Sequence, residues 1–132
     1  MATTSALSAY ARTKVNSIMR NSAAWSQFTP YLSLHTADPS TTGASEVTSG
    51  TCPGYVRKAV TFGTDTGGVF SNSTAVTGPT ASGDWVSTSW YGIWDAETTG
   101  NFIAKCQLDT PKTVLSGDHY EFAIAAISIT IA

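Results

Sequence analysis

The stretch "YLSLHTADPS", residues 31–40, places a histidine and an aspartate three residues apart, at His35 and Asp38. Imidazole and carboxylate groups act as general bases and as metal ligands, so this pair could mark a catalytic or metal site. It could also be a structural corner, where polar side chains bind local backbone groups as a strand ends. Asp38 precedes Pro39 and is therefore pushed out of the helical region, which suits a turn. No third partner of the right type lies nearby in the sequence, so we expect His35, Asp38 and Pro39 to form a structural turn.

Motifs for other chemistries are missing from the sequence. There is no GxSxG for a serine nucleophile, no GxxxxGK[ST] or GxGxxG for phosphates, and the only histidines are His35 and His119. Asp95 and Glu97 could be read as paired carboxylates or as part of a calcium loop, but the EF-hand pattern fails. We expect Asp95 to cap a turn and Glu97 to be solvated. The prediction is no enzyme, with no catalytic, cofactor-binding or metal-binding residues.

Composition narrows the class of protein. Charged residues make up 12% of the 132-residue chain, about half the usual share, and the net charge is −2. Basic residues are scattered, so we expect no nucleic-acid partner, and no apolar run is long enough for a membrane span. Cys52 and Cys106 show no metal-binding spacing; for a protein made in the cytoplasm, two thiols are favoured over a late disulfide. Low charge and many hydroxyl side chains suit a subunit of an assembly.

Hydrophobic spacing predicts one helix followed by strands. Apolar residues spaced by three and four indicate an amphipathic helix at about 5–19, with Thr3, Thr4 and Ser5 as competent N-caps. From about residue 30 to 132 the period becomes two, and Gly, Pro, Asn and Asp clusters separate the runs. The alternating aromatic residues near Trp90 could stack on sugars, although core packing is the more common use. We therefore predict a single mainly β domain over residues 1–132, an antiparallel β-sandwich preceded by one N-terminal amphipathic helix.

Several short motifs occur in a fixed order along the chain: "LSLHTADP", "TGASEV", "GYVRKAVTF", "GIWDA" and "TPKTVLSGD". This order, from Leu7 to Ala132, resembles a family of small virion structural proteins of tailed bacteriophages, commonly labelled tail-fibre or minor structural proteins. The two cysteines depart from the usual family pattern, so the resemblance implies no disulfide. It implies a non-enzymatic virion component, made in the cytoplasm of the host bacterium.

The resemblance leaves two placements on the particle. The chain has no heptads, collagen repeats or β-helix repeats with which to span a long fibre. A compact sandwich with an N-terminal arm instead favours a decoration, or cement, protein on the head exterior that binds the major capsid protein. The alternative is a tail-fibre or baseplate-associated protein that binds tail proteins and contacts the host.

We also expect the chain to bind itself, with a homotrimer favoured because a closed oligomer hides strand edges. The polar N-terminus and the polar loop at 36–54 are the expected assembly contacts, since both look unstructured by pattern and able to order on binding. The candidate contact residues are Met1, Ala2, Thr3, Thr4, Ser5, Thr41, Thr42 and Glu46.

Overall fold

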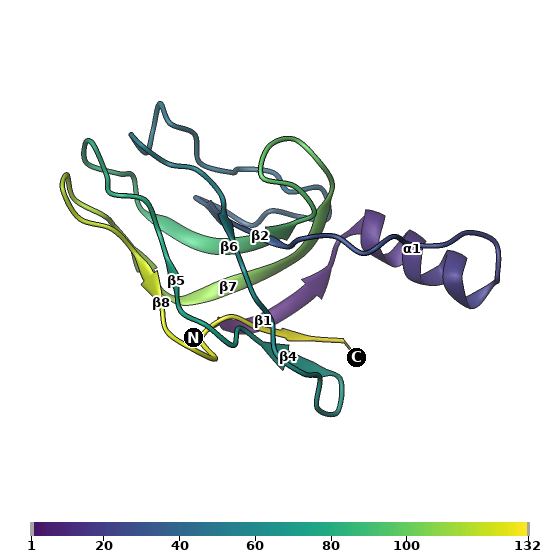
Figure 1. Ribbon diagram of the computed structural model, residues 1–132. Coiled ribbons are helices and arrows are strands. Elements are labelled where there is room, and N and C mark those ends of the chain that lie inside the picture. The colour runs from purple at the N-terminus through teal and green to yellow at the C-terminus, as the bar shows by residue number, and fades with distance from the viewer. Residues whose placement is uncertain (1, 132) are drawn as a thin grey trace.

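A five-stranded antiparallel sheet is the largest element of the fold (Figure 1). The computed structural model describes residues 2–131, with side chains from residue 6 onward. The strand order is β1-β7-β6-β2-β3, and the bounds of these strands are Ala2–Leu7, Phe102–Lys112, Thr88–Trp94, Tyr31–His35 and Lys58–Ala59. β6 and β7 form a hairpin, and β6 occupies the middle of the sheet.

Two short antiparallel pairs complete the sandwich. β4 (Val69–Ser71) pairs with β9 (Ser128–Thr130), and β5 (Val76–Thr77) pairs with β8 (Glu121–Phe122). The predicted fold class is therefore confirmed: the protein is mainly β and antiparallel, with one helix near the N-terminus. No helix in the described part of the chain is long and apolar enough to cross a membrane.

The N-terminal prediction was wrong in two respects. Helix α1 spans Ala9–Met19, with Ser8 as its N-cap, and does not begin near residue 5. The preceding residues 2–7 form β1, which pairs with β7 in a register that sets Ala2 opposite Leu108. Residues 2–5 are thus part of the sheet and not an unstructured extension, while Met1 lies outside the described residues. Pairing with a strand a hundred residues away supplies the hydrogen bonds that a longer helix would have made internally.

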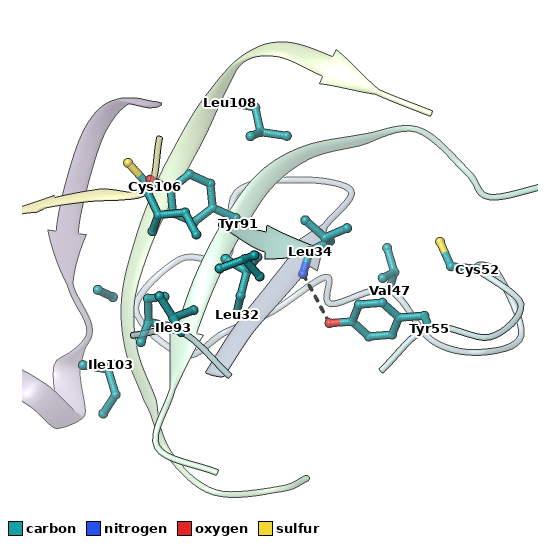
Figure 2. Close-up of a cluster of buried hydrophobic side chains, with 14 of the residues drawn as sticks. Leu32, Leu34, Val47, Cys52, Tyr55, Tyr91, Ile93, Ile103, Cys106 and Leu108 are labelled. Atoms are coloured by element: carbon teal, nitrogen blue, oxygen red, sulfur yellow. Dashed lines mark hydrogen bonds between the residues drawn. The ribbon is translucent and has the colours of Figure 1, made fainter. Parts of the chain in front are cut away.

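The core lies on one face of the large sheet (Figure 2). Leu32 of β2, Tyr91 of β6 and Ile127 are fully buried, and they share a continuous cluster with the side chains that the figure labels. The tyrosine Tyr55 closes one end of this cluster, where its hydroxyl accepts a hydrogen bond from the Leu34 amide at 3.2 Å. Burial of large apolar side chains at this density is the main stabilising contribution to the fold.

The aromatic residues follow their predicted burial only in part. Trp85, Tyr91 and Phe102 are buried, as expected for a central strand and its neighbours. Trp94 and Phe122, which we also expected to be largely buried, are only half-buried. The Trp94 ring instead lies at the end of β6, where it contacts Ser33 and Arg57.

The loop at 36–54 does not project from the body as a free excursion. It returns along β2, where the Val47 amide donates to the Leu34 carbonyl at 3.0 Å and the Thr36 amide donates to the Ser45 carbonyl at 3.1 Å. Val47 and Cys52 are buried in the core. Both cysteines are buried and no disulfide joins them. Burial raises the pKa of the Cys52 thiol.

Candidate functional site

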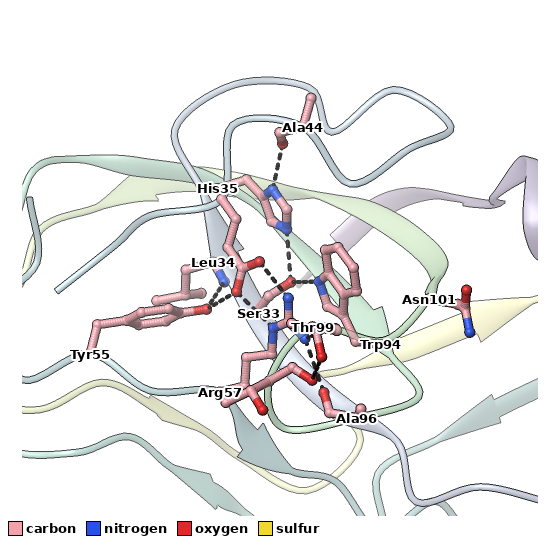
Figure 3. A network of polar contacts seen from close by, with 12 residues as sticks. Ser33, Leu34, His35, Ala44, Tyr55, Arg57, Trp94, Ala96, Thr99 and Asn101 are labelled. Atoms are coloured by element: carbon pink, nitrogen blue, oxygen red, sulfur yellow. Dashed lines mark hydrogen bonds and ion pairs between the residues drawn. The ribbon is translucent and has the colours of Figure 1, made fainter.

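Ser33 and His35 lie on the same face of β2 and form a direct hydrogen bond (Figure 3). The Ser33 Oγ and the His35 Nε2 are 2.7 Å apart, and the His35 Nδ1 lies 2.7 Å from the Ala44 carbonyl oxygen. A carbonyl can only accept, so Nδ1 carries the proton and Nε2 accepts from the serine hydroxyl. Burial lowers the pKa of His35, which favours this neutral imidazole.

Trp94 extends the chain of hydrogen bonds on the same face. Its indole Nε1 donates to the Ser33 Oγ at 3.0 Å, so one ordered path runs from Trp94 through Ser33 and His35 to Ala44. Gly92 is directly opposite Ser33 on β6 and leaves the room for this arrangement. A Cβ at Gly92 would lie 2.4 Å from the Phe102 ring and 2.9 Å from the Ser33 Oγ.

A serine hydroxyl bonded to a histidine Nε2 is the arrangement that activates nucleophiles in hydrolases. Here Ser33 and His35 are both 0% exposed, so a substrate cannot reach the hydroxyl. The other ring nitrogen binds a backbone carbonyl rather than a carboxylate that would stabilise an imidazolium. The pair therefore acts in structure: it fixes the loop at residue 44 to β2 and to the β6–β7 hairpin.

Arg57 is the charged centre of this region. Its Nε and Nη2 donate to the two carboxylate oxygens of Glu46 at 2.8 and 2.7 Å, a bidentate pair. Its Nη1 donates to the carbonyls of Ala96 and Thr99 at 3.0 and 2.7 Å. The guanidinium carbon lies 3.8 Å from the centre of the Trp94 ring, a cation–π contact. We call Ser33, His35, Glu46, Arg57 and Trp94 the polar corner.

The polar corner unites residues that the sequence analysis had treated separately. Alternation along β2 places Ser33 and His35 on one face. Glu46 was an expected assembly contact, yet its carboxylate binds Arg57 and accepts from the Tyr55 hydroxyl at 2.9 Å. Arg57 was counted only as one scattered basic residue. An arginine within the alternating run "GYVRKAVTF" was the available signal, because a charge in a strand needs a partner when it is buried.

Asp38 does not join His35. Its Oδ1 accepts from the Ser40 amide at 2.8 Å and from the Lys105 Nζ at 2.6 Å. Hydrogen bonding to the lysine lowers the pKa of the Asp38 carboxyl. Pro39 is fully buried, and its carbonyl accepts from the amides of Gly43 and Ala44. This turn thus holds the carbonyl that His35 binds.

The other candidate assembly contacts are Thr41, Thr42 and residues 2–5. The Thr41 carbonyl accepts from the Ala9 amide at 3.2 Å, which ties the 36–54 loop to the helix, and Thr42 is exposed. Ala2, Thr3, Thr4 and Ser5 are residues of β1.

Asp95 accepts from the Asn101 amide at 2.7 Å and Glu97 is exposed, so the prediction that Asp95 caps a turn and Glu97 is solvated is confirmed. Among residues 2–131, no group of three His, Cys, Asp or Glu side chains could hold a metal ion.

A groove of about 710 Å³ lies away from the polar corner, between the end of β7 and β8. Leu34, Leu108 and Val114 contribute apolar surface to it. The exposed acidic residues that line it are Asp109, Asp118 and Glu121, and Lys112 and His119 also line it. The size is in the range of ligand pockets, and the mixed lining suits a peptide segment better than a compact apolar ligand.

The protein is an antiparallel β-sandwich, and its buried polar side chains hold the fold together. These features are those of a small structural protein. Residues 6–130 match the family model described as "Podophage GP4 fiber I protein gp80", and the chain belongs to this family. The match confirms the resemblance at the level of a structural protein of the phage virion. No curated protein matches the chain.

Proposed function

We propose that the protein is a non-enzymatic component of the tail fibre of a tailed bacteriophage. The observation that carries this proposal is the family match, which extends over residues 6–130 and names a fibre protein of a podophage. The match covers nearly the whole chain, which supports a fibre role for the sandwich itself.

This proposal selects the alternative placement of the sequence analysis over the head decoration that was first favoured there. The argument for the head was that the chain lacks the repeats of a long fibre. A compact domain can still serve in a fibre if copies associate with one another or with longer tail proteins. A partner among the tail proteins therefore replaces the major capsid protein in our proposal.

The polar corner supports the non-enzymatic part of the proposal. The serine–histidine pair that resembles a nucleophile is enclosed, and His35 binds the Ala44 carbonyl of the loop while Ser33 binds His35. Purified protein should therefore release no sugar or peptide from host envelopes. Release that disappears in a folded Ser33→Ala variant would contradict the non-enzymatic role.

Location on the particle is the direct test of the fibre proposal. Antibody raised against the purified domain and labelled with gold should bind intact virions at the tail when they are viewed by electron microscopy. Virions lacking the protein give the matched control. Label over the head surface, with none at the tail, would overturn the fibre proposal and favour head decoration.

A further inference from the structure

The segment from residue 9 to 29, which we call the arm, projects from the sandwich. It consists of α1 and the chain that returns to β2, and it lies at one end of the molecule in Figure 1. It is anchored at its start, where the Ser8 side chain donates to the Phe102 carbonyl and the Ser8 amide donates to the Ile103 carbonyl at 2.7 Å. Within α1 only Ala11 is buried.

The arm has its own small aromatic cluster. Trp25 packs edge-on against Tyr10, with ring centroids 6.3 Å apart, and lies 5.6 Å from the Phe28 ring. These contacts hold the returning chain against the helix. The arm therefore keeps a defined shape although most of its surface faces away from the body.

Charge is divided unevenly between the arm and the rest of the chain. The arm carries Arg12, Lys14 and Arg20, and the chain has no acidic residue before Asp38. All nine acidic residues follow, together with only four basic ones. The arm is thus a positive projection from a negative body. The repulsion among the positive side chains of the arm is relieved when the arm faces a negatively charged surface.

The groove between β7 and β8 has the opposite charge. Asp109, Asp118 and Glu121 line it against a single lysine, Lys112. Its walls are also partly apolar, so it offers both an acidic rim and an apolar floor. A partner with basic side chains around an apolar tip would complement both features.

Three of the four most exposed apolar side chains fall on the same two surfaces. Of the described large hydrophobic residues, the four most exposed are Met19 at 80%, Ile124 at 66%, Leu115 at 56% and Ile18 at 52%. Met19 and Ile18 lie at the end of α1, Leu115 lines the groove, and Ile124 lies between two groove-lining alanines. The most exposed apolar side chains of the arm and of the groove rim thus lie beside the charges of each surface, as they do in contact surfaces.

The arm of one molecule cannot fill the groove of the same molecule. In Figure 1, α1 lies at the right and β8, which forms one wall of the groove, lies at the left. We propose that the arm of one copy docks in the groove of a second copy, with Ile18 and Met19 on the apolar floor and Arg12 and Arg20 near Asp118 and Glu121. Two different surfaces meet in this contact, so it is head-to-tail and builds a ring or a filament.

The contact does not depend on whether the copies lie on the tail or on the head. It accounts for the expected self-association through surfaces that the sequence analysis did not select. It also answers the objection that the chain is too compact for a fibre, because head-to-tail contacts that do not close extend without limit. Closure after three copies would give the homotrimer that we expected.

Light scattering coupled to size exclusion, at low salt and with increasing concentration of the full chain, tests this contact. The wild-type protein should have a mass of two or more times 13.8 kDa. Arg12→Glu with Arg20→Glu, and separately Asp118→Lys with Glu121→Lys, should each weaken association by about tenfold or more, because like charges then face each other. A chain with all four substitutions should associate as the wild type does.

Matched controls separate docking from folding and from net charge. Asp65→Lys with Glu97→Lys makes the same change of charge as the groove variant, at exposed positions outside both surfaces, and should leave association intact. Ile18→Ser with Met19→Ser should weaken association without any change of charge. Unchanged circular dichroism will show that each variant is folded.

Three outcomes would overturn the proposal. The wild-type chain could remain at 13.8 kDa at every concentration. The two charge variants could associate as tightly as the wild type. The four-substitution chain could fail to recover association, which would mean that the arm binds a surface other than the groove.

Discussion

The polar corner and the arm place charge in opposite ways. In the corner, Arg57 binds the Glu46 carboxylate at 2.7 and 2.8 Å and two carbonyls at up to 3.0 Å, while its own side chain is 8% exposed. In the arm, Arg12 and Arg20 are exposed. The first region has partners for its charges within the chain, and the second leaves its arginines exposed, where the proposed contact would use them.

This difference separates two uses of polar side chains that look alike in a sequence. A buried charge must be paired, because its desolvation is otherwise too costly, so the corner fixes the fold. An exposed charge costs little by itself and contributes to the rate and specificity of association. Stability should therefore respond to changes in the corner, and assembly should respond to changes in the arm and groove.

The largest expected effect on stability comes from Arg57. Replacing it with Met leaves the Glu46 carboxylate without its bidentate partner, and removing one member of a buried ion pair costs about 3 kcal/mol when some solvent still reaches the other. The free energy of unfolding in urea measures this loss. Arg57→Met combined with Glu46→Leu should recover much of it, because no charge then remains buried. A loss below about 1 kcal/mol in the single variant would show that the corner does not hold the fold.

Gly92→Ala should have the next largest effect. The new methyl group would lie 2.4 Å from the Phe102 ring and 2.9 Å from the Ser33 Oγ, so both neighbours must move. Overpacking of this kind costs about 2 kcal/mol. Gly50→Ala is the control, since its nearest neighbour is 3.5 Å away. Equal unfolding free energies for the two variants would contradict the close packing of the corner.

The stability of the corner should depend on pH through His35. Burial lowers the pKa of His35 below its ordinary 6.5, so the unfolded chain binds a proton more readily than the folded one. The free energy of unfolding should therefore fall as the pH drops below 6.5, by at most about 1.4 kcal/mol per pH unit. Urea titrations between pH 7.5 and 5 measure the slope. The slope should persist in His119→Gln and shrink in His35→Gln; the reverse result would contradict the assignment.

Lys105→Met should have the smallest effect. The lysine binds Asp38 at 2.6 Å, but that carboxylate is 53% exposed, and exposed ion pairs contribute about 0.5 kcal/mol. The pKa of the Asp38 carboxyl should rise toward its ordinary 3.8 in the variant, which an NMR titration of its side chain can follow. A loss of stability as large as that of Arg57→Met would remove the contrast between the buried corner and this surface pair.

Local patterns predicted the β-rich antiparallel class and one helix near the N-terminus, because helical spacing, alternation and turn residues act within a few positions. They could not predict β1, whose partner strand lies about a hundred residues away. Nor could they predict the hydrogen bonds of the Arg57 guanidinium, because Glu46 and the turn at 96–99 lie far from Arg57 in the sequence. The sequence shows that no acidic residue precedes Asp38. The structure was needed to show that acidic side chains line a groove that could face the basic arm.

Hydrogen exchange compared between the wild-type assembly and the Arg12→Glu, Arg20→Glu variant tests the division between corner and contact surfaces most directly. Association should slow the exchange of backbone amides in residues 9–29 and 109–123, and leave residues 36–57 unchanged. The contrary result is slower exchange in residues 36–54, where Thr41, Thr42 and Glu46 were the expected assembly contacts, with no change in the arm or the groove. That outcome would show that the loop beside the corner carries the assembly.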